Sequence, residues 1–234
     1  MKKNIDTHLI SISLGGSLVA PKEGFNIDYL LKFRTFILKQ VKDGKRFFIV
    51  VGGGNTARRY QDAAREVGCI IDKDLDRIGI VSTYCNAELL RILFGEYVYP
   101  KVIHDYNKIV NIGKYKIVIG SGWKPGFSTD YVLVSMAKLY DGRKIINLSN
   151  IDAVYDKDPH RYADAQKIKK ITYDDLLDII GKDWTPGKNA PFDPIACKLA
   201  KKLDLSVYVA NGKDLKNLGR ILKDKPFRGT HIFK

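Results

Sequence analysis

Phe47-Phe48-Ile49-Val50-Val51, followed by Gly52-Gly53-Gly54, is the stretch that decides the fold. Five consecutive apolar residues without polar alternation are typical of a strand that is covered on both faces, as in a parallel sheet. Three glycines then end the strand, and residues 57–67 have apolar residues at helical spacing. The stretch therefore predicts a buried strand that turns sharply into a helix.

The same order of apolar stretch, turn and helical spacing repeats along the chain. Further strands are predicted at 8–14, 116–119, 144–148 and 205–210, with a final edge strand at 230–233. Helices are predicted at 28–41, 78–94, 130–140, 173–180, 194–203 and 215–222. This alternation predicts an α/β three-layer sandwich, in which helices cover both faces of a mostly parallel central sheet. No linker or repeat divides the chain, so we expect one domain over residues 1–234. The long polar stretches 152–171 and 181–193 are expected to be functional loops.

Composition excludes some classes of protein and leaves others open. No apolar run in the 234 residues approaches the roughly 20 that a membrane span needs, and the N-terminus does not resemble a signal peptide, so we expect a cytoplasmic protein. The net charge of +14 would attract nucleic acid or phosphorylated substrates, or could be only a solvated basic surface. The lysines are dispersed and no RNA-binding or zinc-finger signature is present, which disfavours nucleic-acid binding.

Glycine turns end three of the predicted strands: Gly15-Gly16-Ser17, Gly52-Gly53-Gly54 and Gly120-Ser121-Gly122. Glycine lets the backbone approach a ligand closely, and the free N–H groups at the following helix start can face an anion. Because ligands bind at the carboxyl ends of parallel strands, these turns predict sites for two phosphorylated ligands. The plainer alternative is that glycine only terminates each strand. The Walker and G-x-G-x-x-G patterns are absent, which disfavours a P-loop kinase and a Rossmann dehydrogenase.

Four segments carry a resemblance to a known family. They are Leu14-Gly15-Gly16-Ser17, the run from Val51 to Tyr60, Pro125-Gly126-Phe127-Ser128-Thr129-Asp130, and the run from Ser149 to Pro159. With them the chain resembles, over nearly its whole length, the uridylate kinases of the amino-acid kinase superfamily, particularly the archaeal-type enzymes. The resemblance implies phosphorylation of UMP by ATP with Mg²⁺, acceptor binding by the N-terminal part and ATP binding by the C-terminal part. It also implies a hexamer.

The resemblance further implies a role for individual residues. ATP would be bound by Gly15, Gly16, Ser17, Gly54, Arg58, Ser149, Asn150, Tyr155 and Asp158. UMP would be bound by Gly53, Asp76, Lys124, Pro125, Gly126, Phe127, Ser128, Thr129 and Asp130. Catalysis would depend on Gly16, Ser17, Asp130 and Asp193, and no residue is assigned as a metal ligand. Asp76 would hold the ribose, whose two hydroxyls suit a carboxylate.

Plainer interpretations of several of these residues remain open. Asp130 could be only an N-cap, and Asp76 could be a surface carboxylate paired with Arg77. Asp158 before Pro159 could be only a turn, and Arg58 with its neighbour could be a solvated helix face. The helix at 28–41, with its aromatic residues, could supply a dimer face or belong to the core.

The chain also departs from the family pattern. Many of these kinases carry a lysine two residues before the first glycine turn, where this chain has Ser13. Lys124, Lys188 or Lys198 could take its place. Ala153 stands where a glycine is usual. Two alternatives therefore stay open: a kinase of the same fold that acts on a carboxylate or on isopentenyl phosphate, and a nucleotide-binding protein without catalysis.

Overall fold

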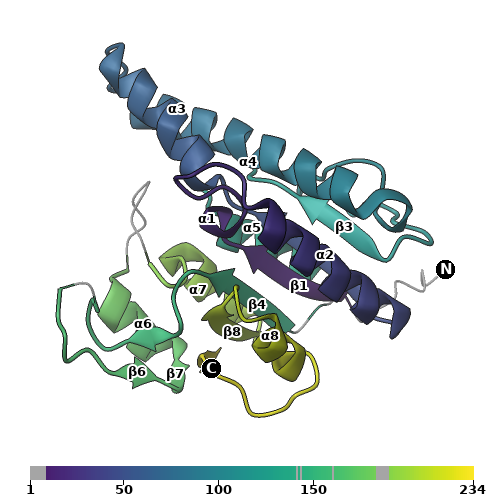
Figure 1. Ribbon diagram of the computed structural model, residues 1–234. Coiled ribbons are helices and arrows are strands. Elements are labelled where there is room, and N and C mark those ends of the chain that lie inside the picture. The colour runs from purple at the N-terminus through teal and green to yellow at the C-terminus, as the bar shows by residue number, and fades with distance from the viewer. Residues whose placement is uncertain (1–8, 141, 143, 160, 183–189) are drawn as a thin grey trace.

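The computed structural model describes residues 9–140, 142, 144–159, 161–182 and 190–234. A seven-stranded sheet in the order β3-β2-β1-β4-β8-β9-β7 forms its centre (Figure 1). The strands are β1 (Leu9–Leu14), β2 (Arg46–Val51), β3 (Ile117–Gly120), β4 (Lys144–Ser149), β7 (Lys170–Thr172), β8 (Ser206–Asn211) and β9 (Thr230–Phe233). A separate antiparallel pair joins β5 (Val154–Tyr155) to β6 (Lys167–Ile168).

Helices cover both faces of this sheet. One face packs against α5 (Thr129–Leu139), α6 (Tyr173–Ile180) and α7 (Pro194–Lys202). The other packs against α1 (Gly16–Val19), α2 (Ile27–Lys42), α4 (Asp72–Phe94) and α8 (Leu215–Ile221). The helix α3 (Gly54–Glu66) pairs with α4 in a hairpin whose tip extends beyond the sheet (Figure 1). The expected sandwich with a mostly parallel sheet is therefore confirmed.

The central strand β2 explains why its sequence lacks alternation. Phe48 and Val50 pack into the core on the side of α5, whereas Phe47 and Ile49 pack into the core on the side of α2. All four side chains are fully buried. Its neighbours on both sides, β1 and β3, run parallel to it, so both edges of β2 are paired as well.

The C-terminal end of the sheet differs from the prediction. The strand β9 is not at the edge, because it lies between β8, to which it is antiparallel, and β7, to which it is parallel. The edge strand β7 comes from the polar stretch 152–171, which also supplies β5 and β6. These strands are two or three residues long, which is too short for a periodic pattern to appear in the sequence.

Two helices also refine the expectations. The helix predicted at 78–94 begins at Asp72, and its first turn carries two aspartates that favour a helix N-terminus. In α2, Tyr29 and Phe33 are buried in the core, so these aromatic residues do not form an exposed dimer face.

No helix in the described ranges has both the length and the apolar character to cross a membrane.

The turns after β1 and β2 touch each other backbone to backbone. A Cβ atom on Gly16 would lie 2.1 Å from the nitrogen of Gly54 and 2.6 Å from the carbonyl carbon of Gly52. Gly54 has φ +61°, and a Cβ atom there would lie 2.3 Å from the carbonyl oxygen of Gly16. No side chain other than hydrogen fits between these turns, so glycine here is a packing requirement as well as a conformational one.

We therefore expect Gly16→Ala to lower the free energy of unfolding by about 3 kcal/mol or more, since the new methyl group would meet backbone atoms that cannot move aside. Urea denaturation followed by circular dichroism would measure the change. Gly219→Ala is the matched control, because a Cβ atom there would make only an ordinary 3.5 Å contact with Phe36, inside helix α8. It should raise stability by about 0.5–1 kcal/mol. Equal stability of both variants would contradict this account of the turns.

Candidate active site

The two touching turns leave backbone donors open. Gly15 donates its N–H to the carbonyl of Leu148 at 2.7 Å, and Gly52 donates to the carbonyl of Leu14 at 3.0 Å. These bonds anchor the start of each turn to its neighbouring strand. The amides that follow donate to no protein group in the part of the chain that the structure describes; they belong to Gly16, Ser17, Gly53 and Gly54. Such a cluster of unpaired N–H groups at strand ends can receive the oxygens of an anion.

The third glycine turn is different, and the expectation that all three turns offer amides is wrong. Ser121 donates its N–H to the carbonyl of Ile103 at 3.0 Å. The N–H of Gly122 donates to the Oγ1 atom of Thr83 at 2.7 Å. Both amides are therefore used inside the protein, and the turn after β3 is a structural support for the site.

Helix α4 carries the carboxylate expected to bind a ribose. The carboxylate of Asp76 accepts a hydrogen bond from the N–H of Gly126 at 2.8 Å, which joins α4 to the loop before α5. Partial burial raises the pKa of Asp76, and the bond from Gly126 acts in the opposite direction. Arg77 lies 3.8 Å from Asp74 instead, so the plainer interpretation of Asp76 as the partner of Arg77 is wrong. Asp76 and Gly126 are thus brought together, and their binding of UMP stays a prediction.

Aromatic rings contact one another in succession from Trp123, in the loop before α5, to Tyr131 in the first turn of that helix. The rings of Trp123 and Phe127 lie 5.2 Å apart, and those of Phe127 and Tyr131 lie 4.5 Å apart. The ammonium group of Lys124 lies 4.0 Å from the centre of the Trp123 ring. Ser128 is the N-cap of α5, because its side-chain oxygen accepts the N–H of Tyr131. Pro125 lies in the loop before this cap, and Thr129 is the first residue of the helix. Asp130 is consequently not the cap.

Asp130 is instead held between two parts of the fold. The hydroxyl of Ser13 donates to its Oδ1 atom at 3.1 Å, and the backbone N–H of Asp193 reaches its Oδ2 atom at 3.2 Å. Although Asp130 as a residue is half-buried, its carboxylate is enclosed by protein. This burial, together with the negative charge of Asp193, raises the pKa of Asp130 to about 7. Asp193 is itself buried, caps α7 through the N–H of Ala196 at 2.7 Å, and has a pKa raised by burial.

Within the described ranges, no lysine takes the place of the one that Ser13 replaces. Lys124 stacks on Trp123, and Lys198 donates to the carbonyl of Lys182 at 2.7 Å. Lys188 lies outside the described residues. Among the described residues, no lysine or arginine forms an ion pair with Asp130 or Asp193. The group on β1 that contacts the Asp130 carboxylate is therefore the neutral hydroxyl of Ser13.

Four of the residues expected to bind ATP lie at the end of β4 or in the segment that follows it. A Cβ atom on Gly15 would lie 3.3 Å from the Cα atom of Ser149, so the ends of β1 and β4 are adjacent. Asn150 comes next in the chain, and Tyr155 lies on β5 opposite Lys167. Asp158 opens a turn in which its carbonyl accepts the N–H of Tyr162 at 2.9 Å. Arg58 projects from the first half of α3 as an exposed side chain.

Two buried polar residues of α4 were missed by the sequence reasoning. Thr83 meets Gly122, as described above, and the side-chain amide of Asn86 donates to the carbonyls of Gly52 at 2.9 Å and Gly53 at 3.1 Å. Positions 76, 83 and 86 are spaced so that they share one helix face. The signal available in the sequence was the presence of polar residues on the face of this helix that packs against the core.

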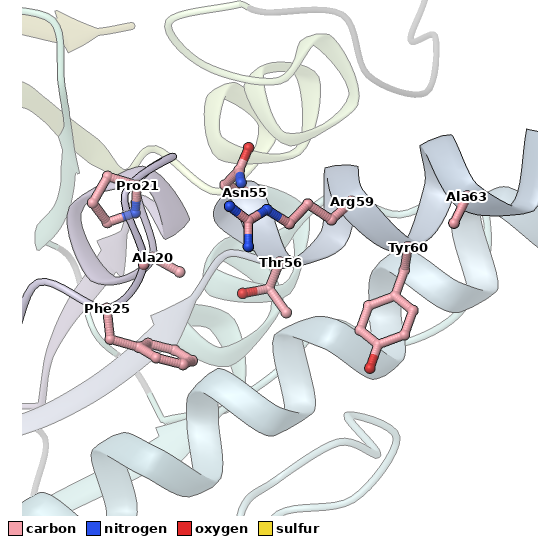
Figure 2. A pocket seen from close by; sticks show the side chains of 9 residues that line it. Ala20, Pro21, Phe25, Asn55, Thr56, Arg59, Tyr60 and Ala63 are labelled. Atoms are coloured by element: carbon pink, nitrogen blue, oxygen red, sulfur yellow. The ribbon is translucent and has the colours of Figure 1, made fainter.

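A separate hollow lies between α3 and the segment that joins α1 to α2. Its volume is about 420 Å³, and it is lined by Ala20, Pro21, Gly24, Phe25, Asn55, Thr56, Arg59, Tyr60 and Ala63. Figure 2 shows Phe25 and Tyr60 at its two ends and the guanidinium group of Arg59 between Asn55 and Thr56. Arg59 donates to the carbonyl of Lys22 at 2.9 Å, and none of the expected site residues lines this hollow.

A mostly parallel sheet with open amides at two strand ends and no P-loop is compatible with an α/β kinase outside the P-loop class. Residues 9–211 match the Amino acid kinase family, and the chain belongs to that family. It is 37% identical to the uridylate kinase of Methanococcus aeolicus over 87% of this chain and 90% of that one. The uridylate kinase structure from Archaeoglobus fulgidus aligns with a TM-score of 0.79 at 29% identity, covering 96% of this chain and 99% of that one. The UMP kinase structure from Bacillus anthracis aligns with a TM-score of 0.81 at 26% identity, covering 97% of this chain and 96% of that one.

The raised pKa of Asp130 makes a prediction about stability. Its folded-state pKa of about 7 lies above the ordinary value of 3.8, so the folded protein binds a proton that the unfolded chain releases between these values. Asp130 therefore lowers the free energy of unfolding as the pH rises from about 4 to about 7. Asp130→Asn removes this penalty, so its stability relative to the parent should increase by on the order of 2 kcal/mol from pH 5 to pH 8.

Urea unfolding at several pH values measures this difference. Asp28→Asn is the control, because Asp28 is exposed and paired with Lys32, and its stability relative to the parent should stay nearly constant. A constant difference for Asp130→Asn as well would show that Asp130 titrates as an ordinary exposed carboxylate.

Proposed function

We propose that this protein transfers the terminal phosphoryl group of ATP directly to the phosphate of UMP and so forms UDP. The observation that carries the proposal is the meeting of the two glycine turns, whose open amides lie on adjacent strand ends. Two phosphates that bind such neighbouring turns would be held for in-line transfer. The names of the similar proteins, uridylate kinase and UMP kinase, support UMP as the acceptor. ATP is the phosphoryl donor in this proposal.

The two turns divide the substrates between them in this proposal. Gly15, Gly16 and Ser17, with the residues that follow β4, bind ATP. Gly53 and the loop from Lys124 to Asp130 bind UMP, with Asp76 as the acceptor for the ribose hydroxyls. Gly54 and Arg58 lie between the two phosphates. The N-terminal part thus binds the acceptor and the C-terminal part binds ATP, within one domain located in the cytoplasm.

The transfer itself requires little from protein side chains. The attacking oxygen belongs to the UMP phosphate and is already anionic, so no strong general base is needed. The open amides and Arg58 stabilise the charge on the transferred group. Among the described residues, no group of three or more His, Cys, Asp or Glu could hold a metal. In this proposal Mg²⁺ would accompany the ATP phosphates and supply further positive charge there.

A coupled ADP-release assay with UMP, CMP, AMP, GMP, a carboxylate such as acetylglutamate, and isopentenyl phosphate tests this proposal. We expect turnover with UMP that exceeds turnover with every other acceptor. Turnover on another acceptor with none on UMP would overturn it. ATP binding by calorimetry without turnover on any acceptor would instead support a non-catalytic nucleotide-binding protein.

We further propose that the protein assembles into a homo-oligomer, a hexamer by resemblance. Exposed apolar side chains on α4 support this, because Val81 and Ile92 are 61% and 66% exposed on one face of that helix. The double variant Val81→Asp with Ile92→Asp should give a smaller particle than the parent in size-exclusion chromatography with light scattering. Ile109→Asp changes an equally apolar exposed residue away from α4 and should leave the mass unchanged. A monomeric parent would contradict the proposal.

A further inference from the structure

Asn86 is a buried amide side chain whose contacts are all to backbone carbonyls of the site. It is 1% exposed, and its Nδ2 atom donates to the carbonyls of Gly52 and Gly53 at 2.9 and 3.1 Å. Because both neighbours are acceptors, only the NH₂ end of the amide can face them. The two hydrogen atoms of one side chain therefore hold two successive peptide groups of the turn after β2.

These bonds help to set the direction of the amides that would face a phosphate, although the carbonyl of Gly53 also accepts the N–H of Ala57 at 3.2 Å where α3 begins. A trans peptide is planar and its C=O and N–H point in opposite directions, and no peptide in the described residues is cis. Turning the carbonyl of Gly52 towards α4 therefore turns the N–H of Gly53 away from α4. The carbonyl of Gly53 and the N–H of Gly54 are related in the same way. These are the two amides of this turn that have no acceptor in the described residues.

At the neighbouring strand end, helix α4 holds a peptide group in the opposite orientation. At the end of β3, Thr83 accepts the N–H of Gly122 at 2.7 Å, while the hydroxyl of Tyr106 donates to the carbonyl of Ser121 at 2.6 Å. This peptide has its N–H towards α4 and its carbonyl away from it. A donor side chain at position 86 and an acceptor at position 83 thus give the two turns opposite peptide orientations, and only the turn after β2 presents its amides.

The fold alone does not account for Asn86. Its Oδ1 atom is buried and has no hydrogen-bond partner in the described residues. An unpaired buried oxygen destabilises the folded state, which a side chain that served packing alone would avoid. Glycine also allows either orientation of its neighbouring peptides, so packing fixes the turn less firmly than a side-chain bond does.

We infer that Asn86 is a positioning residue for phosphoryl transfer, which turns the N–H groups of Gly53 and Gly54 towards the substrate phosphates. This inference rests on the proposed binding of phosphorylated substrates at these turns. Asn86 itself touches no substrate, so its effect must depend on whether the ligand carries a phosphate. A residue that only stabilised the fold would affect ligands with and without phosphate alike.

The experiment compares Asn86→Ala and Asn86→Ser with the parent. Dissociation constants for UMP and for uridine, which lacks the phosphate, are measured by ligand-observed NMR, and kcat and KM are measured with UMP. Asn86→Ala should weaken UMP binding about tenfold, leave uridine binding within a factor of about two and lower kcat by about 10². Asn86→Ser keeps one donor and should lie between Ala and the parent. Thermal unfolding of each variant confirms that it is folded, and the serine variant serves if the alanine variant is not.

Ser82→Ala is the matched control. Ser82 is also buried on α4, but its hydroxyl bonds to the carbonyl of Ile78 in the same helix, so its loss should leave both ligands and kcat unchanged. Equal weakening of UMP and uridine by the Asn86 variants, or no change in either, would overturn the inference. A parent that binds no UMP would refute the proposed function instead, which keeps the two failures distinct.

Discussion

The backbone contact between Gly16 and the Gly52–Gly54 turn is the constraint on which the site depends. It exists because β1 and β2 are adjacent parallel strands whose ends lie in register, with Leu14 opposite Val51. Two backbone segments that leave a sheet from neighbouring strands can approach this closely only if neither carries a side chain at the point of contact. The result is two turns with open amides that touch each other through their backbones, as the proposed transfer between two bound phosphates would need.

Helix α4 converts this contact into a defined geometry. One of its faces reaches the loop before α5 through Asp76, the end of β3 through Thr83 and the end of β2 through Asn86. A helix is stiff over this length, so the loop before α5 and the two strand ends are held at fixed separations. A substrate that contacts Asp76 with its ribose would therefore present its phosphate at a defined position relative to the turn after β2.

The central fold could be predicted from the sequence because β1, β2, β4 and β8 are buried strands bounded by glycine or polar residues. The edge could not, since β7 is three residues long and its pairing with β9 depends on chain segments about 60 residues apart. The glycine turns were found, but their unequal roles depend on Ile103 and Thr83, which approach the third turn only in the folded chain. Asn86 was missed because the sequence shows a polar residue on a predicted apolar face but does not show what that residue contacts. Its partners Gly52 and Gly53 approach it only in the folded chain.

The neutral hydroxyl of Ser13 is consistent with the electrostatics of Asp130. A lysine at this buried position would lose its hydration, a cost that only an opposite charge beside it could offset. Here burial and Asp193 already raise the pKa of Asp130 to about 7, so the carboxyl group is close to half-protonated at neutral pH. An approaching phosphate adds negative charge and shifts the pKa further upwards. A protonated Asp130 would not repel a phosphate at the neighbouring turns, where open amides instead of a lysine would meet the phosphate charge.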